Sequence, residues 1–110
     1  MACEYGFRLT RRAADDIDSI VGYIAGELAN PTAAGSFMDK LRQSIRELQT
    51  FPTSGALVVN EFLPDVCVRK TVVGNYVMYY LPDSDSRSII ILRVIYGRRS
   101  TEEILSELNI

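Results

Sequence analysis

Two adjacent arginines near the C-terminal end are the residues of this chain best suited to chemistry. Arg98 and Arg99 follow a glycine and an apolar segment, in the run from Val94 to Ser100. Guanidinium groups held at the end of a strand can bind a phosphate, a carboxylate of a partner, or the acids of a following helix. Glu102 and Glu103 come soon after. A local ion pair at a helix start is therefore one alternative, and a turn with solvated arginines is another.

Two further arginines, Arg69 and Arg93, lie in segments with strand character. Residues 66–99 carry six basic and two acidic side chains, although the whole chain has a net charge of −2. Arg93 sits in an apolar strand, so it either pairs or snorkels at the edge of the core or forms the floor of an anion-binding groove. Arg69 either stacks on Tyr80 or contacts a target. We expect one cationic recognition surface, made by Arg69, Arg93, Arg98 and Arg99.

The residue types that are missing restrict the chemistry. The chain has no histidine, which removes the commonest general acid or base and the commonest zinc ligand. Cys3 and Cys67 match no metal or redox spacing and fit reduced thiols of a cytoplasmic protein. No segment approaches the roughly 18 apolar residues of a membrane span, and the N-terminus lacks the pattern of a secretory signal. We expect no metal, no cofactor and no membrane.

The hydrophobic pattern predicts one α+β domain over residues 1–110, with element order β-α-α-β-β-β-α. The expected elements are a strand at 5–9, helices at 11–28 and 31–48, an extended piece at 57–59, strands at 66–73, 76–81 and 88–96, and a short helix from 100. The two long helices should form a hairpin on one face of a small antiparallel sheet with a mixed edge. The other face, partly roofed by the last helix, should carry the basic residues.

Local signals support these boundaries. Thr10 is a helix N-cap, and Asn30 followed by Pro31 starts the second helix. The early acids Asp15, Asp16 and Asp18 fall on the face opposite the apolar stripe of the first helix.

Gly74-Asn75 predicts a two-residue hairpin turn. The segment 88–96 is apolar on both faces apart from Arg93, which is typical of a central strand. Ser100 and Glu103 form a capping box.

This order of elements resembles RelE/ParE-type toxins. The residues that carry the resemblance are Leu9–Ile17, Tyr23–Ala25, Phe51-Pro52, Arg69, Val73–Tyr76 with Tyr80, and Leu92–Arg99. The resemblance implies a cytoplasmic bacterial toxin of a type II toxin–antitoxin pair, held inactive in a hetero-oligomer by an antitoxin encoded beside it. It also implies one of two actions. RelE-like members enter the ribosomal A site and cut mRNA, and ParE-like members block DNA gyrase.

The residues favour the ParE-like action, and the protein is then not an enzyme. Metal-independent RNA cleavage must deprotonate the 2′-hydroxyl, stabilise the phosphorane and protonate the leaving oxygen. In RelE-like toxins an arginine follows the tyrosine of the second hairpin strand, whereas here Val77 follows Tyr76. The candidates left for catalysis are Lys70, Tyr96 and Arg99. A ribosome-dependent mRNA endonuclease is the alternative, and a non-toxic interaction module is a third.

Antitoxin binding follows from the expected architecture. A helical hairpin on a sheet leaves an apolar groove and an exposed edge, where an antitoxin tail can add a helix or a strand. An acidic antitoxin segment would mask the arginines of the expected recognition surface.

Reversing the two adjacent arginines tests that surface. We expect the double variant Arg98→Glu/Arg99→Glu to weaken antitoxin binding or toxicity, because it replaces attraction for an acidic partner by repulsion, while the fold survives. Antitoxin affinity, growth arrest and circular dichroism measure the three effects. Unchanged affinity together with unchanged toxicity would contradict the recognition surface.

Overall fold

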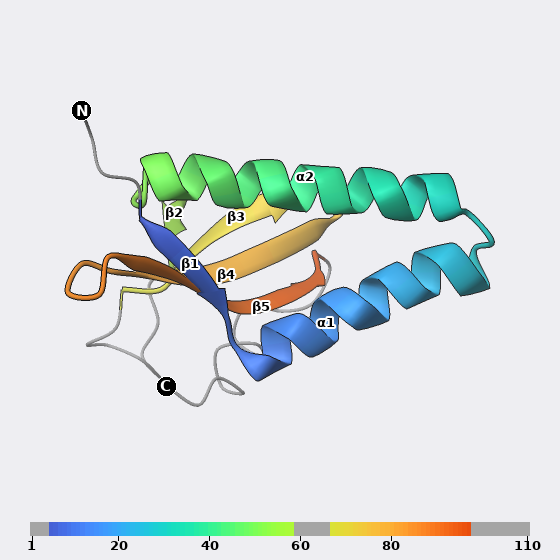
Figure 1. Cartoon of the computed structure of the whole chain (residues 1–110), viewed down its shortest axis with the longest axis horizontal. Coiled ribbons are helices and arrows are strands. Elements are labelled where there is room, and N and C mark those ends of the chain that lie inside the picture. Colours follow the sequence, from blue (N-terminus) through green and yellow to red (C-terminus); the bar gives the residue numbers. More distant parts are fainter. Residues whose placement is uncertain (1–4, 59–66, 98–110) are drawn as a thin grey trace.

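Two helices lie against one face of a five-stranded sheet in the computed structural model, which describes residues 5–58 and 67–97 (Figure 1). The elements are β1 (Gly6–Leu9), α1 (Arg11–Gly22), the π-helical turn η1 (Tyr23–Glu27), α2 (Pro31–Thr50), β2 (Ala56–Leu57), β3 (Arg69–Val73), β4 (Tyr76–Asp83) and β5 (Ser88–Tyr96). The strand order is β1-β5-β4-β3-β2. The predicted α+β class is confirmed, and the predicted helix from Ser100 lies outside the described residues.

The sheet has the mixed edge that the sequence predicted. β1 runs parallel to β5, and the other neighbouring pairs are antiparallel. The turn between β3 and β4 is the predicted Gly74-Asn75 hairpin, and Gly74 has φ +62°, a conformation that favours glycine. β5 lies between β1 and β4, which confirms it as an interior strand.

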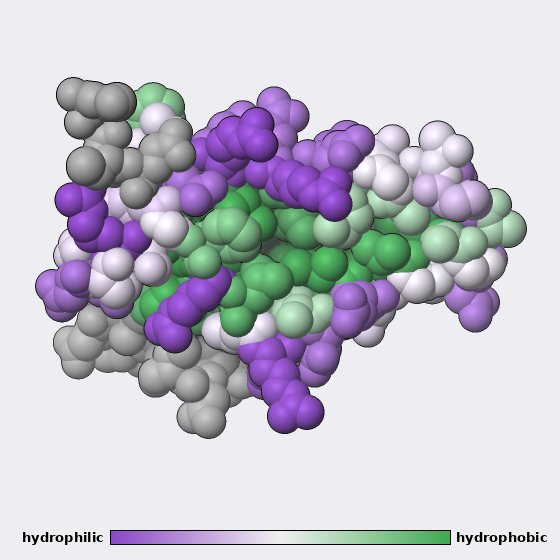
Figure 2. All heavy atoms as spheres, viewed as in Figure 1, coloured by the Kyte–Doolittle hydropathy of each residue, from purple (hydrophilic) through white to green (hydrophobic). Residues whose placement is uncertain are grey.

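Both predicted helix starts are confirmed. The Thr10 hydroxyl accepts a hydrogen bond from the Ala13 amide at 3.1 Å, and the Asn30 side chain accepts one from the Ala33 amide at 3.0 Å. Each cap of this kind contributes about 1 kcal/mol, because it satisfies an amide that has no partner within the helix. The helices join at one end and diverge toward the other (Figure 1). An apolar band is visible between their hydrophilic outer faces (Figure 2).

The first helix ends earlier than the hydrophobic stripe predicts. α1 stops at Gly22, and the chain continues as a π-turn from Tyr23 to Glu27. After it, Ala29 adopts φ +47°, which is strained for a residue with a side chain. Gly22 is the last residue of α1 and Gly26 lies within the π-turn, and glycine lowers the stability of an α-helix. The spacing of apolar residues could not show this change of helix type.

Apolar side chains cover both faces of the sheet. One buried cluster joins the helices to Val73, Met78, Tyr80, Ile89, Ile91 and Val94. A second one, on the opposite face, consists of Val58, Val68, Tyr79, Leu92 and Ile95. The expectation that basic residues occupy this second face holds for only some of the described residues. Lys70 lies there opposite Tyr79, and Arg8 lies there beside Leu81 and Ile90. Arg69 instead pairs with Tyr80, which belongs to the cluster on the helix side.

Helix α1 closes the edge of β5 where β1 ends. The register pairs Leu9 with Ile91, and the chain then turns into α1. The Thr10 amide donates to the Ile91 carbonyl at 3.0 Å, and the Thr10 hydroxyl donates to the Leu92 carbonyl at 3.0 Å. Further along α1, an Asp16 oxygen accepts a hydrogen bond from the Val94 amide at 3.1 Å. A helix therefore supplies the hydrogen bonds that a longer β1 would have made, and an additional strand has no place on this stretch of β5.

No helix among the described residues is both long and apolar enough to cross a bilayer. Within the same residues, no three His, Cys, Asp or Glu side chains lie close enough together to bind a metal ion.

The Asp16 carboxylate offers a direct test of the α1–β5 contact. We expect Asp16→Ala to lower the free energy of unfolding by about 3–5 kcal/mol, because it leaves the buried Arg93 guanidinium without this counter-ion. Urea denaturation measures the loss. The matched control is Asp18→Ala, which removes an exposed carboxylate of the same helix and should change stability by no more than about 0.5 kcal/mol. Equal losses in the two variants would show that the ion pair does not hold the helix.

Candidate functional site

Arg93 forms a buried ion pair with Asp16. Its Nε donates to Asp16 Oδ2 at 2.7 Å, and its Nη2 donates to Oδ1 at 3.0 Å. The residue is only 7% exposed. Of the two uses that the sequence left open for Arg93, the structure shows pairing at the edge of the core. Because the carboxylate neutralises the guanidinium, Arg93 offers little free charge to an anion.

Sequence reasoning placed Asp16 wrongly on the solvated face of the first helix. Asp16 instead faces β5, where it contacts Arg93 and the Val94 amide. The signal that could have found it is Arg93 itself, since an arginine within an apolar strand requires a nearby carboxylate.

The ion pair lies at the wall of a cavity of about 620 Å³ between α1, η1 and the end of β5. We call this cavity the tyrosine pocket. Its lining residues are Asp16, Ser19, Ile20, Tyr23, Leu28, Asn75, Tyr76, Arg93, Val94, Ile95 and Tyr96. Tyr96, a candidate from the sequence, is 47% exposed here. The pocket therefore combines aromatic walls with a neutralised charge pair.

The aromatic rings of the pocket pack edge to face. The ring centroids of Tyr76 and Tyr96 are 5.8 Å apart, and those of Phe37 and Tyr76 are 5.2 Å apart. Burial, followed by the nearby Tyr23 and Tyr96, raises the pKa of Tyr76 above its ordinary value of 10.0. Its phenol therefore stays protonated at neutral pH, so Tyr76 is suited to packing and hydrogen bonding and not to accepting a proton.

Arg69 holds the loop before β2 and does not approach the tyrosine pocket. Its Nη1 donates to the carbonyls of Thr53 and Gly55, at 3.1 and 2.7 Å. The Gly55 amide in turn donates to the Tyr80 hydroxyl at 2.8 Å. The structure thus places Arg69 opposite Tyr80 in the sheet, as the sequence indicated, but directs its guanidinium to backbone oxygens.

The structure does not bring Arg69 and Arg93 together. They lie on β3 and β5, which β4 separates, and they contact a loop and a helix respectively. Lys70 is half-buried on the face of the sheet opposite α1 and α2. Arg98 and Arg99 lie outside the described residues. The binding role of the four arginines and the catalytic role of Lys70, Tyr96 and Arg99 therefore stay predictions.

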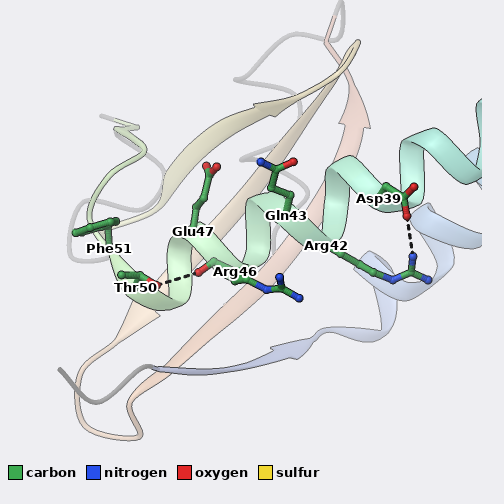
Figure 3. Close-up of a pocket in the computed structure, with 7 residues that line it drawn as sticks. All are labelled: Asp39, Arg42, Gln43, Arg46, Glu47, Thr50 and Phe51. Carbon is green, nitrogen blue, oxygen red and sulfur yellow. Dashed lines mark hydrogen bonds and ion pairs between the residues drawn. The ribbon is translucent and has the colours of Figure 1, made fainter. Parts of the chain in front are cut away.

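A second hollow, of about 550 Å³, lies along the outer face of α2 (Figure 3). Its lining residues are Asp39, Arg42, Gln43, Arg46, Glu47, Thr50 and Phe51. Arg42 pairs with Asp39 at 3.3 Å, and both side chains are exposed. Side chains of both signs extend from this helix in different directions, with Glu47 and Arg46 on different sides (Figure 3). This is a solvated helix face, because the groups do not converge on one point.

Gly55 offers a test of the loop that Arg69 holds, because its amide donates to the Tyr80 hydroxyl and its carbonyl accepts from Arg69. A Cβ at Gly55 would collide with that hydroxyl and lie 2.7 Å from the Lys70 carbonyl oxygen. We expect Gly55→Ala to lower the free energy of unfolding by about 1–3 kcal/mol. The control, Gly35→Ala in α2, has open space around it and should raise stability by about 0.5–1 kcal/mol. Thermal denaturation distinguishes the two. A neutral Gly55→Ala would show that the loop does not depend on close contact.

Comparison with known proteins gives the family. The family model described as ParE toxin of type II toxin-antitoxin system, parDE, matches residues 7–101. Among solved structures, the chromosomal ParDE TA system from P. aeruginosa is similar with a TM-score of 0.65 and 23% identity, over 84% of this chain and 96% of that one. An arginine-to-alanine mutant of E. coli toxin RelE in the free state is similar with a TM-score of 0.61 and 17% identity, over 96% and 95% of the two chains. No curated protein matches significantly. At these identities the structures show the shared fold, while the family model covers most of the sequence: the chain belongs to the ParE toxin family of type II toxin–antitoxin systems.

Proposed function

We propose that this toxin arrests growth by blocking DNA gyrase in the bacterial cytoplasm when it is free of its antitoxin. The observation that supports this action most is the apolar character of the sheet face opposite α1 and α2. Val77 lies there opposite Ile95 and packs against the second buried cluster. RelE-like toxins carry an arginine at the corresponding position, where it can stabilise a phosphorane, and valine cannot replace it.

The two cations that the described residues place on that face, Arg8 and Lys70, are too far apart to act on one phosphate. Arg8 lies on β1 and Lys70 on β3, with β5 and β4 between them. Three steps between strands correspond to about 14 Å, whereas groups that stabilise one phosphorane must lie within hydrogen-bond distance of it. Among the described residues, Lys70 therefore has no second cation beside it on this face. Binding to a protein target, which needs no such convergence, fits this arrangement better.

A ribosome-dependent mRNA endonuclease is the second candidate. The observation that favours it is Tyr96, which is 47% exposed and lies at the end of β5, directly before the segment that carries Arg99. An exposed phenol beside an arginine can take part in proton transfer to RNA.

Two assays separate the candidates. We expect the purified toxin to inhibit supercoiling of relaxed plasmid by gyrase and to leave mRNA intact in a translating extract. Lys70→Ala and Tyr96→Phe should change the inhibition of gyrase by less than about twofold, because neither side chain then performs acid–base chemistry. As a general acid or base, each would contribute about 10²–10⁴-fold to cleavage.

Codon-dependent mRNA cuts with normal supercoiling, abolished by Tyr96→Phe, would replace the gyrase proposal by the endonuclease. Absence of growth arrest when the toxin is expressed without its antitoxin would instead identify a non-toxic interaction module.

A further inference from the structure

The outer side of β1, at one edge of the sheet, carries backbone groups that have no partner among the described residues (Figure 1). The Gly6 and Thr10 amides donate inward, at 2.8 and 3.0 Å, to carbonyls of β5 and of the residue before it. Because the backbone groups of successive strand residues point to alternate sides, the amides and carbonyls of Phe7 and Leu9 point away from the sheet. Unpaired groups of this kind are a template for a further strand.

Both ends of this outer side are closed. At one end, the Tyr5 amide donates to the Gln49 carbonyl at 3.0 Å, and the Gln49 side chain donates to the Tyr5 carbonyl at 2.8 Å. At the other end, the chain turns at Thr10 into α1. The open stretch is therefore residues 7–9, which we call the β1 edge. An antiparallel segment bound there can form a hydrogen bond with each outward amide and carbonyl of Phe7 and Leu9.

The side chains of the β1 edge differ between the two faces of the sheet. Phe7 and Leu9 lie on the helix side, as their partners on β5 do, and they are 49% and 39% exposed. Arg8 lies on the opposite face. Residues that pair across two strands share a face, so a segment that binds this edge meets apolar groups on one face and a cation on the other.

Arg8 is available to a partner. It is exposed and forms no ion pair with a described residue. The Ser86 hydroxyl and, more weakly, Arg8 lower the pKa of Asp83, but the Asp83 carboxylate already accepts hydrogen bonds from the Ser86 hydroxyl at 2.8 Å and the Asp85 amide at 3.1 Å. Arg11, which is also exposed, follows at the start of α1. The β1 edge therefore favours an acidic partner.

A second copy of this chain fits the β1 edge poorly. In the antiparallel register that pairs Phe7 of each copy with Leu9 of the other, the two Arg8 side chains lie directly opposite each other. Like charges in that position are destabilising. Arg8 thus disfavours self-association, as charged residues on edge strands commonly do, and it selects a different chain that places an acid there.

The β1 edge is separate from the tyrosine pocket. Leu9 pairs with Ile91, and β5 continues from there to Tyr96 in the pocket wall, which is about 17 Å along a strand. The antitoxin is expected in the apolar groove between the helices and the sheet. The β1 edge is therefore open to a different partner, and the two surfaces can be altered independently.

We propose that the β1 edge binds an extended segment of DNA gyrase in which an acidic side chain lies between two apolar ones. The segment adds a strand to the sheet through the outward backbone groups of Phe7 and Leu9. Its acid pairs with Arg8, and its apolar side chains cover the two exposed apolar residues. The inference rests on the proposed function, and it names the surface of the toxin that contacts the target.

The first test uses the full-length toxin and purified gyrase. We expect Phe7→Pro to weaken gyrase binding by roughly 30-fold or more in calorimetric titration, because it removes an outward amide and an apolar anchor but no hydrogen bond to β5. Phe7→Ala, which removes only the side chain, should weaken binding by roughly tenfold. The matched control is Val72→Ala on β3, whose side chain is 69% exposed. It should change the affinity by less than about threefold.

The charge of the β1 edge is tested separately. We expect Arg8→Glu to weaken gyrase binding by roughly tenfold in dilute buffer and by less at high salt, because an exposed ion pair is screened. The matched control, Arg46→Glu, reverses an exposed charge on α2 and should leave the affinity unchanged.

Hydrogen exchange distinguishes an added strand from side-chain contact alone. The amides of Phe7 and Leu9 should exchange quickly in the free toxin, because they face away from the sheet, and should be protected when gyrase is bound. Antitoxin affinity of Phe7→Ala and Arg8→Glu should stay within about threefold of the wild type.

Several results would overturn the inference. Unchanged gyrase affinity in Phe7→Ala and Arg8→Glu, with their folds intact by circular dichroism, would do so even if Phe7→Pro fails to fold, and so would a lack of protection at Phe7 and Leu9. Lost antitoxin affinity with normal gyrase inhibition would assign the β1 edge to the antitoxin. A dimer in sedimentation that Phe7→Ala dissociates, with normal gyrase binding, would assign it to a second copy. The proposed function stands in all these cases, whereas a wild type that neither binds nor inhibits gyrase would contradict both.

Discussion

The contact between the Asp16 carboxylate and β5 determines how the two layers of this toxin meet. Its two oxygens bind the Arg93 guanidinium and the Val94 amide, just where β1 no longer covers β5. A buried ion pair adds little net stability compared with apolar packing, but it tolerates few alternative arrangements. The pair therefore fixes the position of α1 along β5. The position of Tyr23 relative to Tyr96, and with it the shape of the tyrosine pocket, depends on that alignment.

Two arginines of the expected cationic surface, Arg93 and Arg69, are each bound by groups of this chain. The Asp16 carboxylate of α1 neutralises Arg93, and Arg69 donates hydrogen bonds to backbone carbonyls of the loop before β2. Both arginines thus serve the fold. The face of the sheet opposite α1 and α2 carries a cluster of buried apolar residues.

The elements that the sequence predicted are those with local causes. The caps at Thr10 and Asn30 and the Gly74-Asn75 turn depend on residues within three positions of one another, so their types alone were sufficient. The interior place of β5 followed from its apolar residues on both faces. Asp16, which pairs with Arg93, is 77 positions away in the sequence. The spacing of apolar residues within one helix or strand cannot predict a contact between two such distant residues. The π-turn was missed because its apolar residues also fit an α-helical stripe. The tyrosine pocket was missed for the same reason, since the π-turn is what lets Tyr23 and Leu28 line one cavity.

The parallel pairing of β1 with β5 has a consequence for the order of events during synthesis. Among the described residues, β1 has no strand partner until β5 exists, since Gly6 pairs with Ser88 and Thr10 bonds to Leu92 across 82 positions. Contacts this far apart in sequence form late and slowly, because a long stretch of chain must first be closed into a loop. The nascent polypeptide therefore cannot pair β1 with β5 before residues 88–91 have been made.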